Sequence, residues 1–263
     1  MKKFLAATAA VIVLAGCGNA APAPMDHGMD HGMDHGAMAS GDGLSASSGG
    51  IRLALKQKTI GSTSFAFQIL GAGGKPVTGF DVDQTKRMHF YLIRSDLTGF
   101  QHVHPEMAAD GTWSAAFAPP LPGSYRVYAS FSTKNKPFVL SDTVSVAGQA
   151  KTEPLPPAAT TTTVDGYTLT VDRGETLSIT VSKNGKPVTD LQPYLQTYAH
   201  LTAFRAGDLA FAHLHPQGMA ASGNGGPKLS FDASLPKAGD WRLYVQFQTA
   251  GKLHTAAVTL QVS

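Results

Sequence analysis

The chain has 263 residues, among them 28 glycines and 16 prolines, and a formal net charge of +3. This length accommodates two domains of ordinary size, and the many turn-forming residues, with no long amphipathic helical pattern, favour all-β modules. The small net charge and the lack of a basic stripe argue against a nucleic-acid-binding protein.

The N-terminus has the pattern of an export signal. A basic start is followed by an apolar stretch, residues 4–14, that is too short to span a membrane. Residues 14–17, Leu-Ala-Gly-Cys, resemble the lipobox of bacterial lipoproteins. The resemblance implies a signal peptide of residues 1–16, lipidation of Cys17, and anchoring in the cell envelope on the extracytoplasmic side of a bacterial membrane. The alternative is an ordinary secretory signal with a chance cysteine, the only one in the chain.

A segment with few large apolar groups, residues 17–50, follows and is predicted to be a flexible tether. It contains the tetrapeptide Met-Asp-His-Gly three times in succession. Thioethers suit Cu(I), whereas imidazoles suit Cu(II), zinc and nickel, so this tract favours copper over zinc as the captured ion. Low-complexity sequence without function is the alternative. The candidate ligands are Met25, Met29, Met33, His27, His31 and His35.

Residues 51–148 contain seven predicted strands separated by turn signals, which is typical of an immunoglobulin-like β-sandwich. A linker rich in proline and threonine, residues 149–163, precedes a second sandwich of the same plan, residues 164–263. The strands expected in the first sandwich are Ile51–Lys56, Ser64–Leu70, Met88–Arg94, Gly99–His104, Thr112–Ala118, Ser124–Phe131 and Phe138–Val146.

The two sandwiches share a set of three histidines with identical internal spacing. Six of the ten histidines in the chain belong to these sets. Much of the remaining sequence differs between the two copies, so the shared histidines look like a retained pattern. They are candidate metal ligands. The first set is His89, His102 and His104, and the second is His200, His213 and His215.

Each set is predicted to lie on one face of a β-hairpin. Residues 88–94 alternate, so His89 and Tyr91 share a face. If the loop that follows has two or four residues, His89 lies opposite His104 and Tyr91 opposite His102, whereas an odd loop shifts the register by one. Three imidazoles so placed can hold one ion at metal–nitrogen distances of ~2.0–2.1 Å. An ordinary structural role for each histidine is the alternative.

Two further predictions concern other side chains. If both histidine faces pointed outward, Tyr91, Ile93 and Phe204 would be exposed, which indicates that another surface covers them. His254 has no counterpart in the first sandwich and is expected to be an ordinary surface residue.

The lipobox, the tandem sandwiches and the two His-X-His-Pro segments, residues 102–105 and 213–216, together resemble exported bacterial metal-handling proteins. Among these the chain resembles the YtkA-like domain group, which is related in style to the copper-resistance protein CopC. This resemblance implies a sandwich that binds copper without turnover, with zinc as the alternative ion. It assigns the ligand role to the two histidine sets.

The predicted function is therefore copper binding, sequestration or delivery by a membrane-anchored lipoprotein, with an envelope protein as copper donor or acceptor. A structural or adhesion module without metal is the alternative, because a sandwich does not define a function. A three-histidine metalloenzyme is a further alternative, and it would need a nearby carboxylate. Glu106 follows the first set but Gln217 holds that place in the second, so no enzymatic activity is expected.

Overall fold

Antiparallel strands form the regular structure of the computed structural model, which describes residues 42–61, 63–220, 223–232 and 235–263. The expected all-β fold is confirmed, since the one helical element in these residues is a short 3₁₀ turn, η1 (Ala72–Gly74). Within the same residues no helix is long and apolar enough to cross a membrane.

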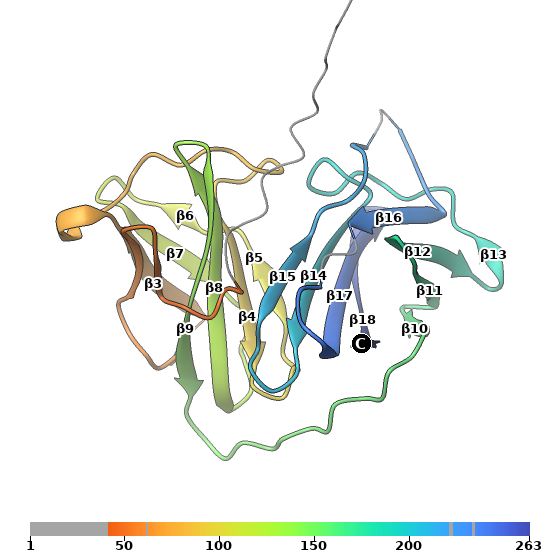
Figure 1. The fold of residues 1–263 in the computed structure, drawn as a ribbon, viewed down its shortest axis with the longest axis horizontal. Helices are drawn as coiled ribbons and strands as arrows, with labels where there is room; N and C mark the ends of the chain where they lie inside the picture. Colours follow the sequence, from red (N-terminus) through yellow and green to blue (C-terminus); the bar gives the residue numbers. More distant parts are fainter. Residues whose placement is uncertain (1–41, 62, 221–222, 233–234) are drawn as a thin grey trace, which may run out of the picture. The chain divides into compact units, whose positions relative to one another are not determined.

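The first sandwich has an outer sheet of order β1-β2-β3-β7-β6 and an inner sheet of order β5-β4-β8-β9 (Figure 1). All seven predicted strands are present, and the two-residue strands β1 and β6 extend the outer sheet. The strands are β1 (Ser47–Ser48), β2 (Ile51–Leu55), β3 (Ser64–Leu70), β4 (His89–Arg94), β5 (Gln101–Val103), β6 (Glu106–Met107), β7 (Thr112–Ala116), β8 (Gly123–Thr133) and β9 (Lys136–Val146).

The second sandwich repeats this plan. Its outer sheet has the order β10-β11-β12-β13, with β16 also paired to β12, and its inner sheet has the order β15-β14-β17-β18. The strands are β10 (Thr161–Val164), β11 (Tyr167–Arg173), β12 (Thr176–Lys183), β13 (Lys186–Pro187), β14 (Ala199–Arg205), β15 (Phe211–Leu214), β16 (Lys228–Asp232), β17 (Gly239–Thr249) and β18 (Lys252–Val262).

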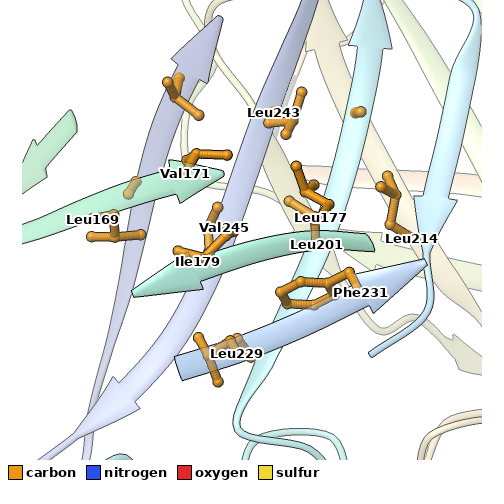
Figure 2. Packing of buried hydrophobic residues seen from close by; sticks show 14 of the residues in the cluster. Leu169, Val171, Leu177, Ile179, Leu201, Leu214, Leu229, Phe231, Leu243 and Val245 are labelled. Atoms are coloured by element: carbon orange, nitrogen blue, oxygen red, sulfur yellow. The ribbon is translucent and has the colours of Figure 1, made fainter. Parts of the chain in front are cut away.

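Each sandwich has its own hydrophobic core, because alternate side chains of its strands point between its two sheets. In the first, the rings of Phe67 and Phe90 stack with centroids 4.4 Å apart and Trp113 lies beside them. Burying such a side chain stabilises the fold by about 1.5–3 kcal/mol. Figure 2 shows part of the second core, with Leu169, Val171, Leu177, Ile179, Leu201, Leu214, Leu229, Phe231, Leu243 and Val245.

A third apolar cluster joins the two inner sheets. Tyr91 and Ile93 of β4 lie in it together with Phe204 of β14, and all three are fully buried. The expectation that another surface covers these side chains is therefore confirmed: each sandwich covers the histidine-bearing sheet of the other. Both sandwiches belong to the same compact unit.

The contacts across this interface are reciprocal. The hydroxyl of Tyr128, on β8, donates to the carbonyl oxygen of Leu209, and the hydroxyl of Tyr244, on β17, donates to that of Leu97. Leu97 and Leu209 occupy matching hairpin turns and have φ angles of 62° and 61°. The two sandwiches are thus related by an approximate two-fold arrangement.

The end of the predicted tether is packed against both sandwiches. Phe211 donates its backbone N–H to the carbonyl oxygen of Asp42, and Lys237 Nζ lies 2.7 Å from Asp42 Oδ2. Ser47–Ser48 pairs with β2. Residues 42–50 therefore contribute to the fold. The predicted signal peptide, Cys17 and the Met-Asp-His-Gly repeats lie outside the described residues.

Candidate metal centre

The two histidine-bearing hairpins have the predicted register. Tyr91 pairs with His102 between β4 and β5, and Thr202 pairs with His213 between β14 and β15. One step along the first hairpin, the His89 ring meets the edge of the His104 ring, with the centroids 5.0 Å apart. The first histidine set therefore shares one face, as expected from the alternation.

A buried ion pair holds the first hairpin loop. The Arg94 guanidinium binds Asp96 with two bonds, of 2.9 and 2.7 Å, and Thr98 donates to the same carboxylate. Burial alone would raise the pKa of Asp96, but these bonds and one from the Glu153 backbone hold that pKa well below its ordinary value. Arg94 N also bonds the carbonyl oxygen of Thr98 within the loop, and beyond it Tyr91 pairs with His102, which is the predicted register.

Histidines from both sandwiches form one continuous row across the interface. The ring centroids are 4.7 Å apart for His104 and His102, 4.5 Å for His102 and His200, 4.5 Å for His200 and His213, and 4.8 Å for His213 and His215. The spacing between sandwiches equals the spacing within them. The two predicted sets are therefore brought together. We call the five histidines of this row, together with His89, the six-histidine cluster.

His89 lies beside this row and completes the arrangement closest to a metal site. One ring nitrogen each from His89, His102 and His104 lies within 4.8 Å of the other two. His89 Nδ1 and His102 Nε2 are 3.1 Å apart, close to the edge of roughly 3.3 Å in a tetrahedron with ~2.0–2.1 Å bonds. Across the described ranges, no second group of three meets the same criterion.

Carbonyl oxygens fix the tautomers of His89 and His102. His89 Nε2 lies 3.2 Å from the Asp83 carbonyl oxygen, and His102 Nδ1 lies 2.7 Å from Gln246 Oε1. Because a carbonyl oxygen only accepts, both nitrogens carry a hydrogen. In the neutral rings, His89 Nδ1 and His102 Nε2 are then bare and face each other at 3.1 Å. Two opposed lone pairs at this distance call for a cation between them, either a proton or a metal ion.

Burial disfavours a proton between His89 and His102, because it lowers the pKa values of the rings. It lowers the pKa of His89 and, with repulsion from His89 and His104, holds the pKa of His102 well below the ordinary 6.5. Burial also lowers the pKa of His104 to about 3. At neutral pH the three rings are uncharged, which is the form that coordinates metals. His104 Nε2 is buried and, among the described residues, has no hydrogen-bond partner, so it is available as a ligand.

The second histidine set is arranged differently. His200 Nδ1 lies 3.1 Å from Gln84 Oε1, and the Tyr91 hydroxyl lies 3.1 Å from His200 Nε2. Both ring nitrogens of His200 are thus paired. His213 Nε2, in contrast, is buried without a partner in the described part of the chain. Burial, together with neighbouring imidazoles, holds the pKa of both His200 and His213 well below 6.5.

Three residues that orient the cluster were not predicted from the sequence. Asp83 and Gln84 belong to a tight turn in which Gln84 and Thr85 have φ angles of 43° and 70°. Such turns usually carry Asn or Gly, so the sequence Gln-Thr gives no signal there. Gln246 lies on β17 of the second sandwich and binds His102 of the first. No local sequence pattern indicates this contact.

The prediction that His254 is an ordinary surface residue was wrong. It is 4% exposed, with Nδ1 2.7 Å from Asp165 Oδ2 and Nε2 2.9 Å from Thr249 Oγ1. Tyr167 continues the network at 2.7 Å from the Thr249 hydroxyl. The polar partners of His254 include Asp165, which is distant in the sequence, and this explains why the sequence pattern missed the network. His254 is a structural residue of the second sandwich.

Comparisons with known proteins identify a family for both sandwiches. A family model described as "Domain of unknown function (DUF8832)" matches residues 46–148 and again residues 158–263. No curated protein matches the chain significantly. Solved structures with some likeness include a biofilm-associated protein BSP domain, a titin fragment and the FN1–FN3 domains of chicken CNTN1.

These structural likenesses are distant. Identity is 13%, 16% and 9%, and the TM-scores are 0.24, 0.20 and 0.21, in the same order. The matches cover 81%, 80% and 78% of this chain and 30%, 96% and 66% of the other chains. The chain thus spans 30% of the length of the biofilm-associated protein. None of the three likenesses carries an argument about function.

Proposed function

The chain belongs to the DUF8832 family and carries two copies of its domain in tandem, and we propose, from the histidine geometry, that these two domains form a copper-binding protein. His89, His102 and His104 hold the ion, and the second sandwich covers and orients them. The observation that carries this proposal is the pair of bare nitrogens, His89 Nδ1 and His102 Nε2, that face each other at 3.1 Å between the neutral rings of a buried and a half-buried histidine. The proposed activity is binding without turnover.

Copper is the proposed ion for two reasons. Neutral imidazoles suit Cu(II) as well as zinc, and a given nitrogen site generally binds Cu(II) more tightly than zinc. The methionines of the Met-Asp-His-Gly tract, which repeats upstream of the sandwiches, add soft ligands that suit Cu(I). The tract would collect the ion and the histidine site would retain it. Zinc is the alternative ion.

We also propose that this binding takes place in the cell envelope. The export signal and the lipobox at Cys17 support lipid anchoring on the extracytoplasmic side of a bacterial membrane. Copper would there be sequestered or exchanged with an envelope protein that donates or accepts it.

A structural role for the six-histidine cluster is the competing proposal. The hydrogen bonds from Tyr91 to His200 and from His102 to Gln246 cross the interface and would help to hold the sandwiches together without any metal. This role predicts that copper does not bind and that replacing the histidines changes only the stability of the interface.

Protein beginning after Ser40, which lacks the repeated tract, is expected to retain one copper ion per chain at pH 7. The variant His102→Ala/His104→Ala is expected to retain none, because a single imidazole remains of the three. The measurement is the copper and zinc content after loading with each metal and washing with a weak chelator. His254→Asn is the matched control, since its amide can replace the bond to Asp165 far from the cluster. The proposal is contradicted if the parent protein retains no copper, or if the double variant still retains it.

A further inference from the structure

Tyr91 makes the two copies of the site unequal. Tyr91 of β4 and Thr202 of β14 are equivalent, since each pairs with the middle histidine of its own set. The Tyr91 ring stacks on His102 with centroids 4.4 Å apart, and its hydroxyl reaches across the interface to His200 Nε2. Thr202 Oγ1 is buried and has no hydrogen-bond partner in the described residues, so it makes no reciprocal bond to His89.

This tyrosine occupies the nitrogen that His200 would offer to a metal. The oxygen of Gln84 accepts from His200 Nδ1, so Nδ1 carries the hydrogen and Nε2 is the lone-pair nitrogen. The Tyr91 hydroxyl lies 3.1 Å from that lone pair and donates its hydrogen to it. The equivalent lone pair in the first copy, on His89, faces only another bare nitrogen.

The other members of the second set remain open to a ligand. His213 Nε2 is buried and unpartnered in the described residues, and the His213 ring lies 4.5 Å from His200 and 4.8 Å from His215. These spacings match those of the first set, whose rings lie 4.7–5.3 Å apart. Unlike the first set, however, these three histidines do not bring one nitrogen each within 4.8 Å of one another in the described residues. The second set therefore has the components of a site, but its His200 is engaged by the Tyr91 hydroxyl instead of converging on the other two rings.

We infer that the Tyr91 hydroxyl closes a second transition-metal site, formed by His200, His213 and His215, and thereby limits the chain to one ion. This inference rests on the proposed function, because it takes the first set as the occupied site. The closed site would accept the same class of ion, Cu(II) or zinc, since its ligands are three imidazoles. Tyr91 acts as a positioning residue, through its hold on His200.

The variant Tyr91→Phe is expected to raise the copper content from one ion to two per chain in protein beginning after Ser40. Phenylalanine keeps the ring that stacks on His102 and removes the hydroxyl, which frees His200 Nε2. Adding His213→Ala to this variant is expected to return the content to one. Tyr128→Phe is the matched control, because it removes another buried hydroxyl of the interface, one that donates to Leu209 rather than to a histidine. The Cu(II) spectrum should show a second signal in Tyr91→Phe alone.

Each outcome separates the inference from the proposed function. If Tyr91→Phe folds normally, by circular dichroism, and still retains one ion, the inference is overturned and copper binding at the first set stands. Two ions retained by the parent protein also overturn it, since the second site is then open. If the parent retains none, the proposed function fails first and the inference with it.

Discussion

The metal-free protein is expected to lose stability steeply as the pH falls from 6.5 towards 4.5. Five rings of the six-histidine cluster have folded-state pKa values below the ordinary 6.5, mainly because they are buried. Above pH 6.5 both the folded and the unfolded chain leave these rings neutral, so their contribution is fully present. Below pH 6.5 these rings become protonated in the unfolded chain but stay neutral in the folded chain. Their contribution to stability therefore falls progressively as the pH is lowered, until the folded pKa values are reached.

The size of this effect follows from the number of rings. Each ring protonated only in the unfolded state costs about 1.4 kcal/mol per pH unit. Several such rings together lower the free energy of unfolding by several kcal/mol between pH 6.5 and pH 5, against a typical total of about 5–15 kcal/mol. Carboxylates contribute below this window: the pKa of Asp96 is lowered from an ordinary 3.8, so its stabilising effect is lost only at still lower pH.

Urea unfolding at pH 7, 6 and 5 measures this dependence. Chelator-treated protein should show a falling midpoint, and His102→Ala/His104→Ala should show a shallower fall because two of the titrating rings are gone. His254→Asn should keep the full slope, since His254 lies outside the cluster. Equal free energies of unfolding at pH 7 and pH 5 would show that the buried rings are protonated as easily in the folded chain as in water.

The variant Phe204→Ala is expected to weaken the docking of the two sandwiches by about 3–5 kcal/mol, the usual effect of truncating a buried aromatic side chain. Phe204 is fully buried at the interface. Its ring centroid lies 5.3 Å from that of Tyr128, 5.6 Å from Phe211, 5.9 Å from Phe100 and 6.1 Å from Tyr244. Its removal leaves a cavity among these rings rather than inside either sandwich core.

Cleavage of the linker reveals this effect directly. A protease site introduced at Lys151, whose side chain is exposed, lies between the two matched domains. After cleavage the two halves of the parent protein should co-elute in size-exclusion chromatography, whereas the halves of Phe204→Ala should separate. Phe231→Ala is the control, because it opens a cavity in the second core without touching the interface cluster. Co-elution of the Phe204→Ala halves at micromolar concentration contradicts the expectation.

The sandwiches and the histidine hairpins could be predicted from the sequence because their determinants are local. The alternation around His89 defines a strand face, and the polar loop at Asp96 fixes an even spacing between β4 and β5. Strand bounds such as Ser64–Leu70 follow from apolar alternation between turn signals. These patterns repeat in the second domain, which strengthened each prediction.

The meeting of the two histidine sets could not be predicted in the same way. The contact of His102 with His200, at 4.5 Å, joins residues from separate domains, and no periodicity encodes it. The same holds for Gln84 and Gln246, which bind histidines of the opposite sandwich. The apolar side chains that accompany the histidines on the inner sheets were the one sequence signal of this interface.

The reciprocal tyrosine contacts, from Tyr128 to Leu209 and from Tyr244 to Leu97, are those of an isologous dimer whose two subunits share one polypeptide. In a dimer of identical subunits every substitution occurs twice, so the bond from Tyr91 to the histidine of the opposite half would be made on both sides of the axis. Covalent fusion removes this restriction: Tyr91 occurs on one side and Thr202 on the other. Fusion of the two halves therefore allows them to take different roles, which symmetry would forbid. One half presents lone-pair nitrogens, and the other supplies the groups that orient and cover them.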